Sequence, residues 1–269
     1  MAAIDIEVIR RVAEAVVQAE PARLGRAGWW KPPLVAAAPV DARFERLTAI
    51  AAPDHLHPRD LLPTARSVVV FFIPFQNALP RANRAGDRPC RDWGVAYVDT
   101  NRLIATVSAE LARRLEAGGD RCGLTPATAN FSEDTLTARW SHKHLGYLTG
   151  IGRFGTHCML ITPAGCAGRL GSFVTEAELG DHPLIETPEA CLLKAGSRCG
   201  RCIAACPVGA LEPAGIRRRR CWDRLLENRS VLDALADLPE DTQVCGKCAA
   251  VMPCSFANPV RRLRTAEGA

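Results

Sequence analysis

Eight of the twelve cysteines in this chain lie between Cys191 and Cys254, and no other feature of the 269 residues constrains the fold as strongly. Residues 199–207 read CGRCIAACP and residues 245–248 read CGKC, so the two densest groups share the spacing Cys-Gly-x-Cys. Cysteines at this density can form disulfides, bind a metal, or fill a core as small apolar side chains. Which of these applies depends first on the redox compartment.

The N-terminal sequence argues against secretion. Residues 1–20 carry charged side chains through their apolar positions, so they lack the uninterrupted core of a signal peptide. The longest strongly apolar run, residues 68–73, is far too short to cross a bilayer. We therefore expect a cytoplasmic protein without a membrane partner, in which thiols stay reduced and clustered cysteines bind metal. The net charge of +5 permits an anionic partner without requiring one.

The order of the cysteines matches the way two [4Fe-4S] clusters are bound. In bacterial ferredoxins a tight run of cysteines ends before proline, and its last cysteine ligates the other cluster. By this rule Cys199 and Cys202 serve one cluster, and Cys206, which precedes Pro207, serves the second. Crossing the two halves of the module predicts two ligand sets: Cys191, Cys199, Cys202 and Cys254 for the first cluster, and Cys206, Cys221, Cys245 and Cys248 for the second.

A zinc site is the alternative to iron and sulfide. Two C-x2-C pairs can hold one zinc ion, but the separation of these pairs exceeds that of a zinc ribbon. Zinc would also leave four neighbouring cysteines without a role. The position three residues before Cys199 is Gly196 rather than cysteine, so Cys191 has to close the first set through a longer loop.

The rest of the chain predicts an α/β domain over residues 1–185, followed by the cysteine module over residues 186–269. Helical periodicity opens the chain from Ile6, and residues 25–53 are expected to be extended or irregular. The run RSVVVFFIPF, residues 66–75, is typical of a strand buried on both faces. Further helices are expected over about 100–116 and 140–148, and a further strand over 157–162.

The segment GIGRFG contains Gly150, Gly152 and Gly155 in the dinucleotide spacing G-x-G-x-x-G. It follows a predicted helix and precedes a predicted strand, which is the reverse of the order that a nucleotide-binding turn requires. A helix-to-strand connection whose backbone closely approaches a ligand or a neighbouring element is the better interpretation.

Four motifs, taken in order, resemble the epoxyqueuosine reductase family and its shorter iron-sulfur relatives: ARSVVVFFIPF, WSHKHLGYLTGIGRFGTHCMLIT, CGRCIAACPVGAL and CGKCAAVMPC. The resemblance implies a nitroreductase-like cobalamin-binding α/β (α+β) domain followed by a ferredoxin-like domain with two [4Fe-4S] clusters. It further implies that the clusters relay electrons to cobalamin for the reductive elimination of an epoxide in a modified tRNA base. The difficult chemistry would then belong to the cofactor.

Three features depart from the family pattern. The family carries an acidic residue resembling a proton donor in a motif that begins Asp-Ser and is soon followed by proline, whereas this region reads NFSEDTLTARWSHKH. Here Asp134 is the candidate acid, with capping of the next helix as the alternative. The opening cysteine of the first cluster is displaced. The chain ends about fifteen residues after Cys254, without the family's C-terminal helical-repeat extension, so we expect a short relative.

The resemblance also suggests which residues face the cofactor. His142 and His144 lie just before the glycine-rich segment, and one of them is expected to contact a corrin side chain or the substrate. Gly150, Gly152 and Gly155 would let the backbone approach the cofactor, and Cys166, which stands beside glycines, is a further candidate. Ordinary burial is the competing interpretation of Cys166.

Two functions from different classes remain. The first is an oxidoreductase that passes electrons through two clusters to cobalamin, with an electron donor such as a flavodoxin or ferredoxin as its partner. The second is a ferredoxin-like electron carrier or redox subunit without cobalamin or a substrate of its own. Binding of tRNA is a weaker expectation, because the sequence does not interleave aromatic and basic residues.

Overall fold

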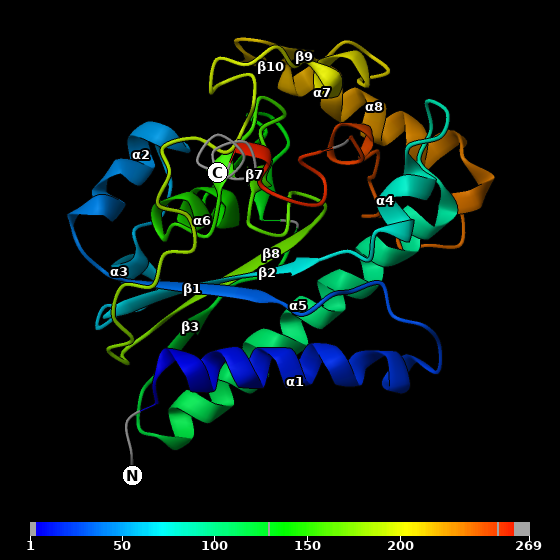
Figure 1. Ribbon diagram of the computed structural model, residues 1–269. Coiled ribbons are helices and arrows are strands. Elements are labelled where there is room, and N and C mark those ends of the chain that lie inside the picture. Colours follow the sequence, from blue (N-terminus) through cyan, green and yellow to red (C-terminus); the bar gives the residue numbers. More distant parts are fainter. Residues whose placement is uncertain (1–3, 129, 252, 261–269) are drawn as a thin grey trace, which may run out of the picture. The chain divides into compact units, whose positions relative to one another are not determined.

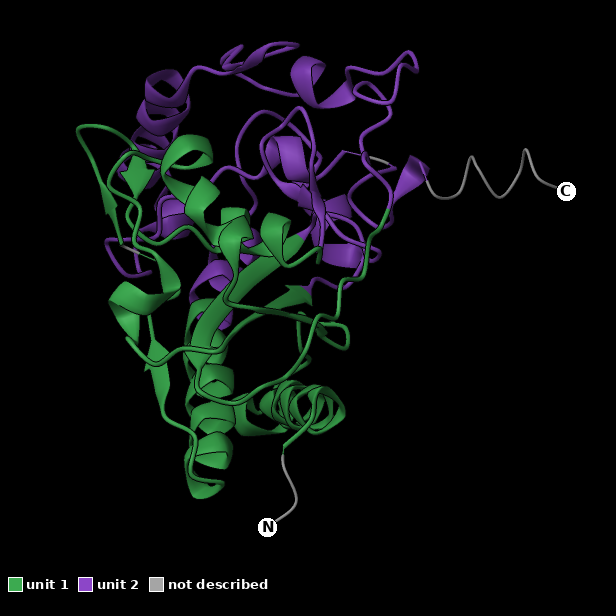
Figure 2. Cartoon of the chain, turned by 90° about the vertical axis from the view of Figure 1, so that its left-hand side faces the viewer, with its two compact units in different colours: residues 1–73, 101–151, 168–186 green, residues 74–100, 152–167, 187–269 purple. Residues whose placement is uncertain are grey.

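The computed structural model describes residues 4–128, 130–251 and 253–260. Contacts divide the chain into two compact units (Figure 2): residues 1–73, 101–151 and 168–186 form unit 1, and residues 74–100, 152–167 and 187–269 form unit 2. The last boundary between the units, after residue 186, lies one residue from the predicted domain boundary at 185/186. Unit 2 differs from the predicted C-terminal domain because it also takes in residues 74–100 and 152–167, and the predicted domain's last nine residues lie outside the described ones.

A four-stranded sheet with helices on both faces organises unit 1. The strand order is β1-β2-β8-β3, with β1 at Leu34–Pro39, β2 at Ser67–Pro74, β3 at Cys122–Leu124 and β8 at Gly168–Thr175. Strands β1 and β2 pair antiparallel, as do β3 and β8. Figure 1 shows α1 (Ile6–Leu24) on one face of this sheet and α6 (His142–Leu148) on the other. Unit 1 is therefore the mixed α/β domain that the sequence predicted.

The two best sequence predictions concern β2 and α1. All eight residues of β2 are buried, as expected of its continuous apolar run. Helix α1 begins at an N-cap, Asp5, whose carboxylate accepts the backbone N–H of Val8 at 2.9 Å, and ends at Gly25 with φ +63°. These caps satisfy backbone groups that the first and last turns of a helix leave unpaired.

Two predictions of secondary structure were wrong in part. Residues 25–53, expected to be extended or irregular, include the extended strand β1, but they also contain the 3-10 helix η1 (Ala42–Arg46) and helix α2 (Leu47–Ile50). Helix α5 spans Arg91–Ala117, so it begins about nine residues before the predicted start. Its first turns are stabilised by tertiary packing, because Gly94 lies against the side chains of Leu235 and Leu238.

Unit 2 is built from short elements joined by loops. They are α4 (Ala78–Asn83), the hairpin β6 (Arg153–Phe154) and β7 (Leu160–Ile161), α7 (Arg201–Ala204), the hairpin β9 (Leu211–Glu212) and β10 (Gly215–Ile216), α8 (Arg218–Val231), and the 3-10 helices η2 (Asp233–Leu235) and η3 (Lys247–Ala249). In unit 1, α3 (Pro58–Leu61), β4 (Phe131–Ser132) and β5 (Thr137–Ala138) complete the connections. Within the described residues, we find no helix with both the length and the apolar character needed to cross a bilayer.

Candidate metal centre

Four cysteines from three separate segments line one cavity in unit 2. Cys191 and Cys199 lie in the loops before α7, Cys202 lies on α7, and Cys254 lies in the turn after η3. The cavity encloses about 370 Å³, part of it open to solvent. Four thiols around one space are the donor set of a [4Fe-4S] cluster, and they are the four residues that the sequence grouped as the first set.

The electrostatics of Cys202 reflect the same grouping. Burial and then the thiolates of Cys254, Cys191 and Cys199 raise the pKa of Cys202 to about 11. Each neighbour acts in the same direction because a second negative charge close by disfavours ionisation. A metal that binds the four sulfurs removes this repulsion, since it replaces the protons and compensates the charge.

The second predicted set also gathers in unit 2. Burial and then the thiolates of Cys245, Cys221 and Cys206 raise the pKa of Cys248 far above its ordinary value. Burial raises the pKa of Cys245 as well, with Cys206 adding to the effect. All twelve cysteines of the chain are free thiols rather than disulfides. Cys248 is therefore close enough to Cys245, Cys221 and Cys206 to repel them as thiolates, and Cys202 of the first set acts on it as well. The four residues of the second set could share a second cluster.

A small apolar core lies beside both cysteine sets. Its buried members are Cys202, Leu211 and Val251, and the residues packed against them include Cys206, Cys248 and Cys254. Members of both sets thus contact one core across the short helix α7. Apolar packing of this kind limits the access of water to the sulfurs, and solvent exposure is one of the factors that set the potential of a cluster.

Close backbone approaches hold the two C-terminal ligand segments in place. Gly246 has φ +71°, and a Cβ there would come within 2.2 Å of the Trp93 indole. Gly165 has φ +89°, and a Cβ there would come within 2.4 Å of the carbonyl group of Ser255. Only glycine combines the positive φ with such short approaches. These contacts position the loop that carries Cys245 and the turn that carries Cys254.

Two residues of the candidate site were missed by sequence reasoning, namely Thr156 and His157. The Thr156 hydroxyl lies 3.5 Å from the sulfur of Cys191, and His157 Nε2 lies 3.6 Å from the sulfur of Cys254. The Met159 backbone N–H donates to His157 Nδ1 at 3.1 Å, so the ring proton is on Nε2 and faces the sulfur. Both side chains are buried. His157 therefore donates a hydrogen bond to Cys254, and Thr156 lies at hydrogen-bonding distance from Cys191, a different member of the first set.

Hydrogen bonds favour the thiolate form of Cys191. Burial alone would raise the pKa of Cys191, but the Thr156 hydroxyl and the backbone amides of Lys194, Thr156 and Leu193 outweigh burial and lower it. Donors directed at a sulfur stabilise its negative charge, which is the form that binds metal.

Cys166 lies against Cys254 in the buried part of unit 2. Its backbone N–H donates to the carbonyl oxygen of Cys254 at 2.8 Å, and its thiol lowers the pKa of Cys254, with His157 acting in the same direction against burial. The pKa of Cys166 itself is raised by Cys254 and by burial. The sulfurs of Cys166 and Cys254 and a ring nitrogen of His157 all lie within 4.8 Å of one another. Cys166 is thus a neighbour of the first cysteine set.

His142 is held by hydrogen bonds inside unit 1. Its Nε2 lies 3.0 Å from the carbonyl oxygen of Pro126, which only accepts, so Nε2 carries the proton. The hydroxyl of Ser172 then donates to Nδ1 at 2.7 Å and accepts the Trp140 indole N–H at 3.0 Å. Burial lowers the pKa of His142 to about 4, so the ring is neutral at pH 7. Both nitrogens are used within the chain.

The other expected acid-base residues lie on α6 and in the hairpin before it. His144 Nδ1 lies 2.8 Å from the hydroxyl of Ser141, the residue that precedes α6. Asp134 is exposed in the turn between β4 and β5, which the Leu136 N–H closes by donating to the carbonyl oxygen of Ser132 at 2.8 Å. The alternative that Asp134 caps the next helix was wrong, because α6 begins eight residues later.

The three glycines pack against protein atoms. A Cβ at Gly150, where φ is +74°, would come within 2.6 Å of Pro183, and a Cβ at Gly152 would come within 3.1 Å of the Ile161 carbonyl oxygen. A Cβ at Gly155 would come within 2.6 Å of the His157 ring. The interpretation of GIGRFG as a tight helix-to-strand connection is therefore confirmed, and Gly155 provides the space that His157 occupies beside Cys254.

Comparison with known proteins gives one curated relative. No family profile matches the sequence. The epoxyqueuosine reductase of Bacillus subtilis (strain 168) is 27% identical over 182 residues, which are 65% of this chain and 43% of that protein. The match thus spans less than half the length of the curated relative.

Solved structures share the fold over most of the chain. An epoxyqueuosine reductase structure from Bacillus subtilis matches with a TM-score of 0.55 and 18% identity, covering 93% of this chain and 67% of that one. The Streptococcus thermophilus structure matches with a TM-score of 0.53 and 15% identity, covering 95% and 68%. A catabolic reductive dehalogenase matches with a TM-score of 0.53 and 13% identity, covering 87% of this chain and 31% of that one.

Proposed function

We propose that this chain, which is related to the epoxyqueuosine reductases, is an oxidoreductase that carries electrons through two [4Fe-4S] clusters to a bound cobalamin. The observation that supports it most directly is the cavity lined by Cys191, Cys199, Cys202 and Cys254. A cluster held there would accept and release single electrons. The second cluster would be held by Cys206, Cys221, Cys245 and Cys248 in a ferredoxin-like arrangement.

The chain's own part in this function is to hold the clusters and adjust their electronics. His157 donates a hydrogen bond to the Cys254 sulfur, and the Thr156 hydroxyl lies 3.5 Å from the Cys191 sulfur. The apolar core around Leu211 and Val251 covers Cys202, Cys206, Cys248 and Cys254. Cobalamin, when bound, would supply the reducing cobalt centre. A single-electron donor such as a flavodoxin or ferredoxin would reduce the clusters.

Asp134 is our candidate proton donor. It lies in an exposed hairpin turn, and one structure of the Bacillus subtilis relative has its aspartate-bearing catalytic loop swung out of the active site. We propose that the Asp134 turn moves toward the substrate in a comparable way. Asp134→Asn should abolish turnover and leave cluster content unchanged, whereas the neighbouring control Glu133→Gln should retain turnover. Equal activity of the two variants would remove Asp134 from this role.

A modified RNA is the substrate class that the comparisons suggest. A relative was crystallised with an epoxyqueuosine-modified tRNA stem loop, so this RNA is the first substrate to test. Reduction of the modified base by the reconstituted protein with a chemical reductant would support a reductase of that class. If the protein carries both clusters and cobalamin but does not convert this RNA, its substrate is a different molecule.

A second candidate function is an electron carrier that binds no cobalamin. The observation that favours it is the engagement of both His142 nitrogens with Pro126 and Ser172, because a residue expected near the corrin is then satisfied by the chain itself. Anaerobic EPR of the reconstituted protein with added cob(II)alamin separates the two functions. A cobalt spectrum changed by the protein supports the reductase, and a free-cobalamin spectrum beside cluster signals supports the carrier.

A further inference from the structure

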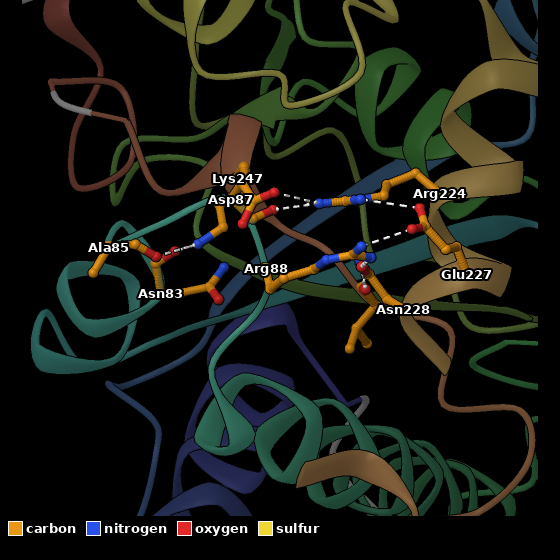
Figure 3. A network of polar contacts seen from close by, with 9 residues as sticks. Asn83, Ala85, Asp87, Arg88, Arg224, Glu227, Asn228 and Lys247 are labelled. Atoms are coloured by element: carbon orange, nitrogen blue, oxygen red, sulfur yellow. Dashed lines mark hydrogen bonds and ion pairs between the residues drawn. The ribbon is translucent and has the colours of Figure 1, made fainter. Parts of the chain in front are cut away.

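A network of polar contacts joins three parts of unit 2: residues 83–88, helix α8 and the CGKC segment (Figure 3). It contains three cationic side chains. Arg224 is 7% exposed and donates to Glu227 at 2.9 Å and to the Asp87 carboxylate at 3.2 Å. Arg88 donates to Glu227 at 2.6 Å and to the Asn228 side chain at 2.9 Å. Both arginines therefore have carboxylate partners.

The third cation, Lys247, has a different environment. It is 3% exposed, and its Nζ donates to the backbone carbonyl oxygens of Asn83 and Ala85, both at 2.6 Å. Among the residues that the structure describes, no carboxylate lies within ion-pair distance of this ammonium group. Burying an ammonium ion costs several kcal/mol, and neutral carbonyl groups offset only part of that cost. A further negatively charged group near Lys247 would offset the rest of this free-energy cost.

The groups that face Lys247 identify that partner. Lys247 stands between Cys245 and Cys248 in the sequence, at the first position of η3. Burial lowers the pKa of Lys247, the charges of Cys245, Cys90 and Asp87 act in the opposite direction, and Arg224 adds to the lowering. Asp87 is already paired with Arg224. Among the negative groups that act on Lys247, Cys245 has the largest effect, ahead of Cys90 and Asp87.

Lys247 is also held firmly in this position. Asn83, which is fully buried, donates from Nδ2 to the Cys245 carbonyl oxygen at 2.9 Å and accepts the Cys90 N–H at 3.0 Å. Gly246 lies directly on the Trp93 indole. The loop that carries Lys247 is thus held by contacts with Asn83 and Trp93.

We propose that the charge of Lys247 raises the reduction potential of the cluster held by Cys206, Cys221, Cys245 and Cys248. The inference rests on the proposed function, because it requires that this set binds a cluster. Reduction adds one electron, taken from the external single-electron donor, and breaks no bond to the sulfurs. It makes the cluster more negative, and a buried cation beside two ligands stabilises that added charge.

Lys247 should act more strongly than the larger group of surface charges nearby. Arg217–Arg220 directly precede Cys221, but all four side chains are exposed. Water and dissolved ions screen exposed charges within about 8–10 Å at ordinary ionic strength, and a buried charge is screened much less. One buried ammonium therefore outweighs the four exposed guanidinium groups.

The test is an anaerobic redox titration of the reconstituted protein, followed by EPR, on four forms of the chain. K247Q removes the charge and keeps a hydrogen-bond donor, and K247R keeps the charge. K194Q is the matched control, because Lys194 is an exposed lysine three residues from Cys191. We expect K247Q to lower one of the two reduction potentials by at least 59 mV. For one electron, this shift corresponds to a tenfold decrease in the equilibrium constant for reduction. K247R and K194Q should leave that potential unchanged.

The outcomes separate the role of Lys247 from the presence of the second cluster. If both clusters form and K247Q does not shift either potential, or K247R lowers it as much as K247Q, the inference is overturned. If the parent chain never assembles a second cluster, the proposed function fails instead. If K247Q does not retain iron, the reduction potential of the unsubstituted protein is measured at increasing salt concentration instead. A potential that stays constant supports a buried charge, and a potential that falls steeply assigns the raised potential to the exposed arginines.

Discussion

Replacing Gly165 with alanine should destabilise the protein through one contact that can be specified. Gly165 ends the turn Thr162–Gly165, in which the two residues exchange backbone hydrogen bonds at 3.0 and 2.9 Å. An alanine Cβ would lie 2.4 Å from the carbonyl group of Ser255 and 2.5 Å from the backbone nitrogen of Phe256. Backbone atoms cannot turn aside as a side chain can, so the turn that carries Cys254 has to shift.

The expected cost has two parts. A non-glycine residue at φ +89° costs roughly 1–2 kcal/mol, and overpacking a close contact costs roughly 1–3 kcal/mol more. Gly119→Ala is the matched control, because Gly119 has φ +101° and an alanine Cβ there would meet no described neighbour within 4 Å. The control should therefore lose only the first part, roughly 1–2 kcal/mol.

The assay is thermal unfolding of the anaerobically reconstituted variants at one scan rate, together with iron content. For a chain of this size, each kcal/mol lowers Tm by roughly 2–4 °C, so Gly165→Ala should unfold about 2–12 °C below Gly119→Ala. Gly165→Ala should also lose about half its iron, because Cys166 and Ala167 bond to the turn carrying Cys254. Equal Tm values and full iron in both variants would refute the reasoning.

Three further predictions follow from the site. Cys191→Ser should remove about four of eight iron atoms, whereas Cys122→Ser, a change in a strand of unit 1, should remove none; equal losses would contradict the proposed ligand set. His157→Leu should lower the potential of one cluster by on the order of 30–60 mV in a redox titration, because the N–H donor to the Cys254 sulfur is lost; an unchanged potential would argue against that bond. His142 should stay neutral down to about pH 4 in an NMR titration. As the pH is lowered from about 6.5 to 4, the free energy of unfolding should fall, because the unfolded chain then binds a proton that the folded chain does not. Titration of His142 near pH 6.5 would exclude its hydrogen-bonded position between Pro126 and Ser172.

Local pattern predicted the elements whose sequence signal is strong. The apolar run at residues 66–75 indicated a fully buried strand, and the periodicity from Ile6 indicated helix α1. Strand β1 was predicted only as part of an extended or irregular segment, because residues 34–39 are rich in alanine and end in proline, both poor strand formers. The early start of α5 was missed because Gly94 is favourable there only through its packing against Leu235 and Leu238.

In the candidate site, too, the sequence indicated some residues and missed those whose role depends on distant contacts. Cysteine order indicated Cys199, Cys202 and Cys254 as one set, and Cys191, which departs from the regular spacing, completed it as the nearest upstream cysteine. His157 could not be found in this way, since its partner Cys254 lies 97 residues away. The sequence signal was its place two residues after Gly155, whose missing side chain leaves room for the ring.

The most direct test of the account is the amount of iron and acid-labile sulfide bound per chain after anaerobic reconstitution, with zinc measured in the same sample. Two [4Fe-4S] clusters predict about eight iron and eight sulfide per chain, without zinc. About four of each would contradict the second cysteine set, and zinc without sulfide would contradict the iron-sulfur assignment of both.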